Sequence, residues 1–503
     1  MNLLFIHPTP ALRHDKAYLQ ACDILSATGR INPVFVYNGF ELEQGAHKVP
    51  TESFNEWVQS NEAEINATDI LTLEARYPRS NLWQGIVSER RISNYSLLNG
   101  SYPTIRYTHD ELIYFLKALV LFYEQILEKY KIEAILAHHT DNAHSSILFE
   151  MARSTSQVCF LLFPDYYWNQ GWHYLFDSKY FMSTAIKRYY HQALAHYDEM
   201  VLPREREIQH YLDLRNANDP SNCATRVLPN LTLRKNLRNA LEGGKKSHLK
   251  RFWRKPGIID GFGHLHMPTS IKGFLMRNLN LLANRYFFRC AKELPSKPFA
   301  YFPLQRVPEA AMLSRAPVYL NQQGLIQAIS ASLPAGYMLV VKDHPRCNGI
   351  HSPRFYKGMS DLENVVVIES GFSNHEILDR CKLVITLAGT LGFQQLMKNK
   401  PVVMFGRKFY ETLKGVIRID DMNELPYRLK DILIGGHQPD PNAMQRSLFA
   451  FVAALLEYRY EVNADAVSLH HKPAELAQLI ERMVEREVAM LVEEKSMTGK
   501  ASV

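Results

Sequence analysis

Short apolar runs alternate with longer amphipathic stretches along the first 200 residues. β-Branched and aromatic runs predict strands at 3–6, 33–37, 134–137 and 158–163. Between them, apolar residues recur at helical spacing and predict helices over 16–28 and 144–153. Strands that alternate with helices form a mostly parallel sheet covered on both faces, so the pattern predicts an α/β unit.

A longer helix is predicted to begin at Thr108, because Glu111 stands three residues later and completes a capping box. Its apolar residues fall on one side of the helix as far as Tyr130. These residues are Leu112, Phe115, Leu116, Leu119, Phe122, Ile126 and Leu127. One side of this helix is therefore expected to pack against the predicted sheet.

The second half repeats the pattern of strands and helices. Strands are predicted at 299–302, 338–341, 365–368, 383–386 and 402–405. The fold class is thus α/β, with two Rossmann-like domains. We expect a first domain over 1–205, a basic linker with accessory helices over 206–295, a second domain over 296–445, C-terminal helices over 446–495 and a disordered tail over 496–503.

Length and composition agree with two domains, because 503 residues exceed the size at which one core keeps growing. The 46% hydrophobic and 22% charged residues exclude disordered and fibrous classes. The 6 cysteines form no C-x-x-C pair and the first residues do not resemble a secretory signal. No apolar run is long enough to cross a bilayer. We therefore expect a cytoplasmic protein without structural zinc, or one peripheral at the inner face of the inner membrane.

One strongly basic stretch stands between the two domains. Residues 231–256 hold nine Lys or Arg and a single acid, Glu242, with Phe252 and Trp253 among them. Such a stretch suits docking on an anionic membrane, here through Lys245–Lys255. A solvated basic loop is the alternative interpretation. No motif supports nucleic-acid binding.

The candidate chemistry follows the strands of the second domain. Ligands of parallel sheets bind beyond the carboxyl ends of the strands. The strand 338–341 runs into Lys342, Asp343, His344 and Pro345, which brings a cation, a carboxylate and an imidazole to one strand end. A histidine in such a position is either a ligand for an anion or a structural group.

Two further strands end in polar groups. After 383–386 the chain carries Thr386, Gly389, Thr390 and Gly392, a turn whose backbone N–H groups can meet a phosphate. The alternative is a tight turn with glycines for packing. After 299–302 come Gln305 and Glu309, and Glu309 is either a site carboxylate or a solvated acid. No G-x-G-x-x-G or P-loop motif occurs, which removes the main support for dinucleotide oxidoreductases and P-loop NTPases.

These motifs together resemble the capsule polysaccharide biosynthesis family, which includes the bacterial β-Kdo transferases. The matching positions, over about 110 residues, are Tyr301–Gln305, Pro308, Glu309, Leu333–Gly336, Val341–Pro345, Asn364, Val365, Thr386, Gly389, Thr390, Gly392, Lys400–Val402, Phe405 and Gly406. The resemblance implies a GT-B-like architecture, with two facing Rossmann-like domains and a cleft between them. It also implies that the second domain holds the donor nucleotide and the first holds the acceptor.

Residue roles follow from the resemblance. It implies that His344 and Pro345 contact the donor phosphate, that Gly389, Thr390 and Gly392 form the phosphate-side turn, and that Glu309 stands near the acidic nucleophile of a retaining mechanism. The catalytic candidates are Glu309 and Asp343. The donor-binding candidates are Gln305, Lys342, His344, Pro345, Thr386, Gly389, Thr390 and Gly392. Two departures are Gln394, where the family usually has an acid, and the missing consecutive aspartates after Gln305.

Candidates for the acceptor side come from the first domain. They are His7, Glu89, Arg90, His138, His139, Asp141 and Asp165. His138, His139, Asp141 and His144 also suggest a metal site, but adjacent side chains of an extended segment point to opposite sides. No D-x-D motif occurs. We therefore predict a metal-independent enzyme without a cofactor, for which the nucleotide sugar is a substrate.

The expected function is transfer of a sugar from a nucleotide donor to a capsule or other surface polysaccharide. CMP-Kdo or a related CMP-linked acidic sugar is the first expected donor and a UDP- or GDP-hexose the second. The acceptor is a glycan or lipid-linked glycan. Two alternatives remain at this stage: a nucleotide-sugar epimerase of the same architecture, and a non-catalytic protein of polysaccharide assembly or export.

Overall fold

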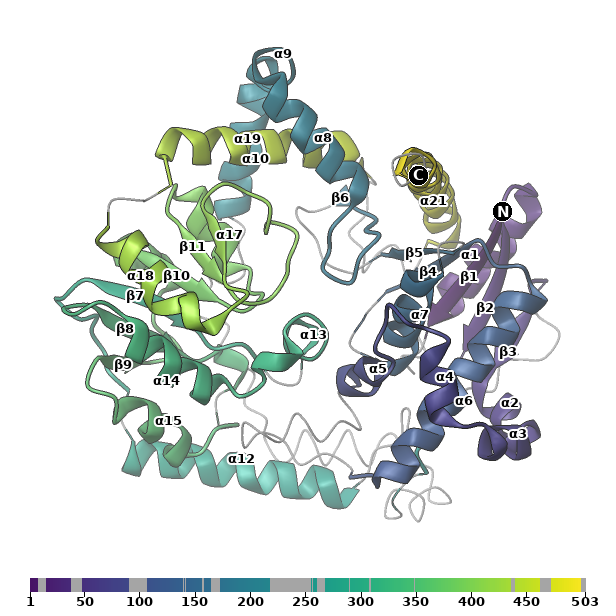
Figure 1. The fold of residues 1–503 in the computed structure, drawn as a ribbon, viewed down its shortest axis with the longest axis horizontal. Helices are drawn as coiled ribbons and strands as arrows, with labels where there is room; N and C mark the ends of the chain where they lie inside the picture. Colours follow the sequence, from purple (N-terminus) through teal and green to yellow (C-terminus); the bar gives the residue numbers. More distant parts are fainter. Residues whose placement is uncertain are drawn as a thin grey trace.

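The structure is a computed structural model that describes most of the chain. The described residues are 1–7, 15–37, 48–89, 106–138, 140, 142–155, 158–163, 172–217, 255, 257–259, 267–288, 290–306, 309–347, 349–435, 439–461 and 472–498. Two α/β units lie side by side (Figure 1).

The first unit is built on a parallel sheet of five strands. Its strands are β1 (Asn2–His7), β2 (Asn32–Tyr37), β3 (Thr51–Ser53), β4 (Ala134–Ala137) and β5 (Cys159–Leu162), in the order β3-β2-β1-β4-β5. Every neighbouring pair is parallel. Residues 3–6 of β1 and all four residues of β4 are buried because helices cover both faces of the sheet. The α/β unit predicted from the alternating pattern is confirmed.

The longest helix of this unit is α6 (His109–Lys129), and it begins as predicted. Thr108 accepts a hydrogen bond from the Glu111 backbone N–H at 3.2 Å, and the Glu111 carboxylate accepts one from the Thr108 N–H. The other helices of this unit are α1 (Asp15–Thr28), α2 (Phe54–Ser60), α3 (Glu62–Ala67), α4 (Ile70–Ala75), α5 (Trp83–Ser88) and α7 (Ala143–Ser154). The next three helices, α8 (Thr184–Ala195), α9 (Tyr197–Met200) and α10 (Glu205–Ala217), lie beside the second unit (Figure 1).

The second unit holds a parallel sheet of six strands. They are β7 (Phe299–Pro303), β8 (Met338–Lys342), β9 (Val365–Ile368), β10 (Leu383–Thr386), β11 (Val402–Met404) and β12 (Val416–Arg418), in the order β12-β11-β10-β7-β8-β9. Its helices are α13 (Ala310–Leu313), α14 (Gln322–Ser332), α15 (Pro353–Ser360), α16 (Asn374–Arg380), α17 (Leu391–Met397) and α18 (Leu425–Leu433). The two parallel-sheet units confirm the predicted GT-B-like fold class.

The strand order places a topological switch point in each sheet. In the second sheet the chain leaves β7 for β8 on one side and later returns to β10 on the other, so the crevice between β7 and β10 is the expected ligand position. In the first sheet β1 and β4 are neighbours in the same way. Residues that follow these four strands are the ones to examine for function.

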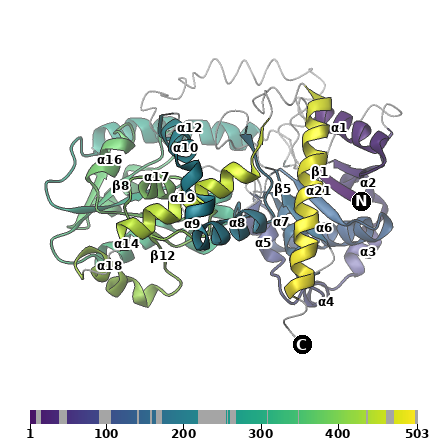
Figure 2. The same ribbon diagram turned by 90° about the horizontal axis from the view of Figure 1, so that it is seen from above.

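The C-terminal helices lead the chain back to the first unit. Helix α19 (Pro441–Tyr458) packs along α8, and β13 (Tyr460–Glu461) pairs antiparallel with β6 (Trp172–His173). Helix α21 (Pro473–Thr498) then packs on α1 and lies across the first unit (Figure 2). Residues 496–498 are therefore helical rather than part of a disordered tail, and 499–503 lie outside the described residues.

Most of the predicted basic linker lies outside the described residues. Helix α10 precedes this part, and α12 (Met267–Phe287) follows it and contacts α15 of the second unit. Of the stretch 245–255 only Lys255 is described; its Nζ lies 2.9 Å from a Glu111 oxygen and 4.6 Å from the centre of the Tyr107 ring. Among the described helices, none is long and apolar enough to cross a membrane.

Candidate active site

The switch point of the second sheet brings Gln305 and the turn after β10 together. The buried Gln322 side chain holds the Gln305 backbone, because its Oε1 accepts from Gln305 N at 2.7 Å and its Nε2 donates to Gln305 O at 2.9 Å. A Cβ atom on Gly389 would lie 2.7 Å from Gln305 Nε2 and 2.8 Å from Thr386 Oγ1. The loops after β7 and β10 are thus in direct contact, as the strand order requires.

The turn after β10 is tightly packed. Thr386 is fully buried and its Oγ1 accepts from Gly389 N at 3.2 Å, while the Tyr410 hydroxyl donates to Gly389 O at 2.5 Å. A Cβ atom on Gly392 would collide with that Tyr410 hydroxyl. This geometry supports the alternative that Gly389 and Gly392 are needed for the close packing of a tight turn. The hydroxyl of Thr386 holds the turn and does not face solvent.

This packing gives a stability prediction for Gly392→Ala. Tyr410 cannot move away without losing its hydrogen bond to Gly389, so we expect a loss of about 1–3 kcal/mol in the free energy of unfolding. Gly371→Ala is the matched control, since a Cβ there meets nothing within 4 Å, and it should stay within about 0.5 kcal/mol of the wild type. Urea unfolding measures both. Equal stability of the two variants would contradict the described packing.

The end of β8 holds its two charged residues inside the protein. Lys342 Nζ donates to Phe372 O at 2.6 Å and to Asn374 Oδ1 at 2.5 Å, and burial lowers the pKa of Lys342 to about 8. Asp343 is 4% exposed; its Oδ1 accepts from His344 N at 2.7 Å and its Oδ2 from the Tyr356 hydroxyl at 2.5 Å. Burial raises the pKa of Asp343, while His351 and these hydrogen bonds lower it.

These contacts give two of the predicted site residues structural partners. Asp343 has both oxygens engaged inside the protein, which argues against its predicted catalytic role. Lys342 braces the segment 372–374 instead of contacting a phosphate. His344, by contrast, is partly exposed, and Pro345 is exposed at the start of the 3-10 turn η6 (Pro345–Cys347). The donor-side role of these two residues stays a prediction.

Glu309 stands immediately before α13 and is half-exposed. Its side chain is 33% exposed, and its Oε1 lies 4.0 Å from Arg306 Nη1. Its charge acts on residues of two other loops. Burial raises the pKa of Cys347 and lowers the pKa of Lys408. The negative charge of Glu309 raises the pKa of each of these two residues. Glu309 therefore lies among the loops that follow β7, β8 and β11.

Lys408 is a candidate site residue that the sequence analysis missed. It follows β11 and is 6% exposed, and no hydrogen bond or ion pair joins its Nζ to another residue that the structure describes. Burial lowers the pKa of Lys408 far below its ordinary value, Arg315 lowers it further, and Glu309 opposes them. The signal was present, because Arg407 and Lys408 directly follow the matched Gly406 at a strand end.

The two units meet at this edge of the second sheet. Helix α13 contacts α5 of the first unit and lies between the units (Figure 1). Arg315 Nε donates to Lys179 O at 3.1 Å and its guanidinium lies 3.9 Å from the centre of the Phe181 ring. Arg407 lies over the Tyr180 ring at 4.7 Å. Residues 179–181 lie between β6 and α8, so this connection faces Arg315 and the loop after β11 here.

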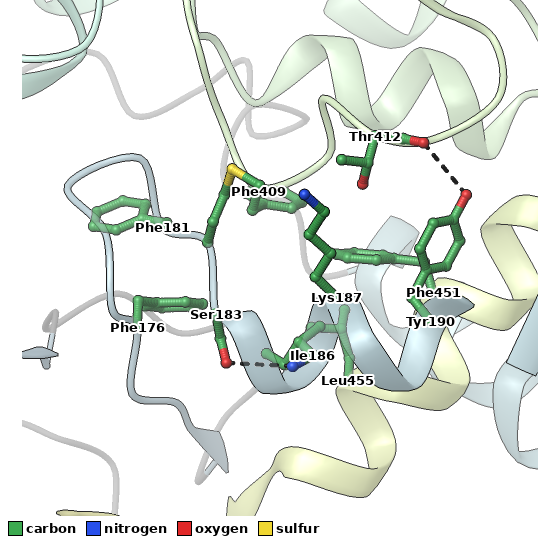
Figure 3. A pocket seen from close by; sticks show the side chains of 11 residues that line it. Phe176, Phe181, Ser183, Ile186, Lys187, Tyr190, Phe409, Thr412, Phe451 and Leu455 are labelled. Atoms are coloured by element: carbon green, nitrogen blue, oxygen red, sulfur yellow. Dashed lines mark hydrogen bonds between the residues drawn. The ribbon is translucent and has the colours of Figure 1, made fainter. Parts of the chain in front are cut away.

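A mainly apolar pocket lies beside this junction. It is lined by α8, by α19 and by the loop after β11, including Tyr190, Phe409 and Phe451 (Figure 3). Lys187 is the one charged residue of its lining, and Tyr190 donates to Thr412 O at 3.4 Å. With so little charge, this pocket fits a nucleotide phosphate less well than the surroundings of Lys408 do.

The structure describes only three of the acceptor-side candidates. His7 is the last residue of β1 and is in register with Tyr37. Glu89 is buried and its Oε2 accepts from Ala143 N at 3.0 Å, so it holds the start of α7. His138 is also buried, with Nδ1 2.9 Å from Phe163 O. Neither Glu89 nor His138 faces an acceptor in this arrangement. Arg90, His139, Asp141 and Asp165 lie outside the described residues.

The described histidines do not support the metal cluster considered for the first unit. His144 is buried and its Nδ1 is 2.7 Å from the Tyr123 hydroxyl. Within the described part of the chain, one group has metal-ligand spacing, and it lies in the second unit: Asp343, Cys347 and His351.

Comparison with known proteins supports the resemblance found in the sequence. Residues 296–433 match the family model described as "Capsule polysaccharide biosynthesis protein", which confirms that resemblance over the second unit. No curated protein matches the chain in sequence.

Several solved structures are similar in outline. A β-Kdo 2,7 transferase, KpsC of Thermosulfurimonas dismutans, covers 71% of this chain and 88% of its own at 12% identity and a TM-score of 0.33. The UDP-GlcNAc 2-epimerase of Methanocaldococcus jannaschii covers 91% and 100% at 11% identity and 0.25. The sucrose-phosphate synthase of Thermosynechococcus elongatus covers 97% and 100% at 10% identity and 0.27. At these TM-scores the three structures carry no argument about activity.

Proposed function

We propose that this chain is a glycosyltransferase that moves a sugar from a nucleotide donor to a surface-polysaccharide acceptor. One observation carries the proposal: three loops at the carboxyl edge of the second sheet, those after β7, β8 and β11, carry Gln305, Glu309, His344 and Lys408 beside the first unit. All four residues lie in the segment that matches the capsule family. Cations that face a half-exposed carboxylate suit an anionic donor whose anomeric carbon needs electrostatic stabilisation.

The donor is proposed to be a CMP-linked acidic sugar, with CMP-Kdo first and a UDP- or GDP-hexose second. Lys408, Arg315 and Arg306 outnumber Glu309 among the charges near the site, which favours a donor that carries more than one negative group. A CMP-linked acidic sugar offers a phosphate and a carboxylate, and a UDP-hexose offers two phosphates. The proposed transfer uses these cations in place of a divalent metal to hold the donor.

Nucleotide binding tests this proposal most directly. Calorimetric titration with CMP, UDP and GDP should give clear binding of CMP and weaker binding of the other two. His344→Ala should weaken nucleotide binding about tenfold, because a charged hydrogen bond contributes about 1.5–3 kcal/mol, while the thermal unfolding midpoint stays near that of the wild type.

Three outcomes would contradict these assignments. A His344→Ala protein that unfolds at much lower temperature yet binds normally would make His344 structural. Release of free sugar or an epimerised donor, with no transfer to any glycan acceptor, would favour the epimerase instead. No turnover of any donor would favour an assembly protein.

We also propose an anionic membrane surface as a partner, as expected from the basic stretch 245–255. Helix α12 follows that stretch, contains no acidic residue and exposes an apolar stripe at helical spacing. The stripe consists of Ile271, Leu275, Leu279, Leu282 and Tyr286, which are 41–74% exposed. Apolar side chains flanked by Lys272, Arg277 and Arg285 suit the boundary between headgroups and acyl chains of an anionic leaflet.

Vesicle co-sedimentation tests the membrane proposal. The wild type should sediment with vesicles rich in phosphatidylglycerol, and Leu279→Glu should reduce the bound fraction several-fold, as should neutralising the lysines and arginines of 245–255. Leu71→Glu is the matched control, because Leu71 is an equally exposed leucine on α4. Equal binding by all four proteins would remove the membrane as a partner of this surface.

A further inference from the structure

Three metal-binding side chains converge on the loop that follows β8. Asp343, Cys347 and His351 stand four residues apart in sequence, and each offers one ligand atom. A carboxylate oxygen, the sulfur and an imidazole nitrogen all lie within 4.8 Å of one another. All three side chains are buried. The sequence analysis overlooked this group because it contains no C-x-x-C or H-x-x-x-H pair.

The ligand atoms of this group indicate which metal ion it would bind. Sulfur, imidazole nitrogen and carboxylate oxygen are together the ligands that Zn²⁺ takes, whereas Mg²⁺ and Ca²⁺ prefer oxygen alone. A carboxylate buried in a protein is costly unless a cation or hydrogen bonds compensate it. The nearest cationic candidate is His351, whose Nε2 lies 3.9 Å from Asp343 Oδ2, beyond hydrogen-bonding distance. Hydrogen bonds from Tyr356, from His344 N–H and from Cys347 already compensate part of the cost of burying the carboxylate, and a bound dication would add to them and bring the ligand atoms closer together.

Neighbouring groups orient two of the ligands. The Tyr356 hydroxyl donates to Asp343 Oδ2 at 2.5 Å and the His344 N–H donates to Asp343 Oδ1 at 2.7 Å. The His351 ring stacks on Phe355, with ring centres 4.0 Å apart and planes 12° from parallel. Hydrogen bonds and packing of this kind fix ligand orientation in metal sites.

The backbone of the loop is held from outside by α12. Asn280 Nδ2 donates to Gly349 O and Ile350 O, and Asn284 Nδ2 donates to His351 O at 2.9 Å. Gly349 has φ of +77°, and a Cβ atom there would lie 2.8 Å from Arg277 O. A glycine is therefore required where the loop turns against α12, and the fixed backbone carries Cys347 and His351 toward Asp343.

We propose that Asp343, Cys347 and His351 bind one Zn²⁺ as a structural ion, with a fourth ligand completing a tetrahedron. The ion would tie the end of β8 to the start of α15 and so fix the η6 turn between them, which carries Pro345 next to His344. Arg306 and Glu309 lie near enough for their charges to act on the Cys347 thiol, and the ion is proposed to support the loop and not to hold the donor. The proposal does not depend on glycosyl transfer.

Metal binding by the full-length purified chain tests this site. After removal of metal with a chelator, Zn²⁺ titrated in competition with a chromophoric chelator should bind one equivalent with submicromolar Kd. Co²⁺ in place of Zn²⁺ should give tetrahedral visible bands and a thiolate-to-cobalt charge-transfer band in the near ultraviolet. Cys347→Ser should abolish the charge-transfer band. Both Cys347→Ser and His351→Gln should weaken Zn²⁺ binding at least about a hundredfold.

A buried cysteine elsewhere in the same unit provides the control. Cys381 donates from Sγ to Leu378 O and Gln395 Oε1 and is not part of the group, so Cys381→Ser should keep the charge-transfer band and full Zn²⁺ affinity. If Cys347→Ser or His351→Gln fails to fold, the cobalt spectrum of the wild type still shows whether a thiolate binds the ion. No binding, cobalt bound without a thiolate band, or unchanged affinity in both ligand variants would overturn the proposal. The three side chains would then form only a hydrogen-bonded cluster.

Discussion

Replacing Glu309 with glutamine is expected to lower kcat by about a hundredfold to a thousandfold while donor affinity stays close to that of the wild type. A carboxylate beside an anomeric carbon stabilises the positive charge that develops in an oxocarbenium-like transition state, and the neutral amide cannot. The effect belongs to the transition state and not to the ground state, so it should appear in turnover at saturating donor. Initial rates over a range of donor concentrations separate the two quantities.

The matched control is Glu424→Gln, the same chemical change at an exposed carboxylate that also has an arginine partner, Arg428 at 3.2 Å. It should leave kcat and donor affinity unchanged. Trapping a sugar on Glu309 would establish a retaining double displacement. Near-native turnover of Glu309→Gln with weaker donor binding would instead mean that Glu309 binds the donor or braces its loop. The glycosyltransferase proposal would survive that result.

Hydrophobic periodicity predicted most of the fold. The strands with four or more buried β-branched or aliphatic residues, such as β4 and β10, were found from sequence because a strand buried on both faces is a continuous apolar run. The short edge strands β3 and β12 were not, since three residues carry too little periodicity. The pairing of β13 with β6 joins residues almost 300 positions apart in the chain, and no local pattern contains it.

The site was predicted less completely, because the ends of strands could be located and the directions of their side chains could not. Lys342 and Asp343 are consecutive and so point to opposite sides, and their partners Asn374 and Tyr356 come from segments whose approach depends on the whole fold. Lys408 was missed because the family pattern ended at Gly406. A cation that directly follows a parallel strand was a sufficient local signal for it.

The Lys408 ammonium is expected to destabilise the free protein, and a bound anionic donor is expected to offset that cost. Lys408 is 6% exposed as a whole, and among the described residues its Nζ has neither a hydrogen-bond acceptor nor a carboxylate at ion-pair distance. An ammonium in that position costs free energy of folding, and an anion that reaches it recovers that cost on binding. A lysine retained for binding therefore destabilises the free protein.

Lys408→Met should consequently weaken donor binding about tenfold to a hundredfold and at the same time raise the midpoint of thermal unfolding, by roughly 2–4 °C for each kcal/mol recovered. The control is Lys400→Met near the other end of β11. Lys400 Nζ donates to three carbonyls, those of Leu378, Asp379 and Cys381, so its loss should lower stability and leave donor affinity unchanged.

The pH dependence of stability and of donor binding provides a second, independent test of the prediction for Lys408. The folded-state pKa of Lys408 lies below its unfolded value of about 10.4, so the stability penalty is complete below the folded pKa and is relieved as the pH rises from there toward 10.4. The stability advantage of Lys408→Met over the wild type should therefore shrink across that window.

Donor binding at a pH above the folded pKa should take up a proton, which calorimetry in buffers of different ionisation enthalpy measures. A Lys408→Met protein that is less stable than the wild type and binds donor normally would show that the ammonium already has a structural partner, and Lys408 would then leave the proposed site.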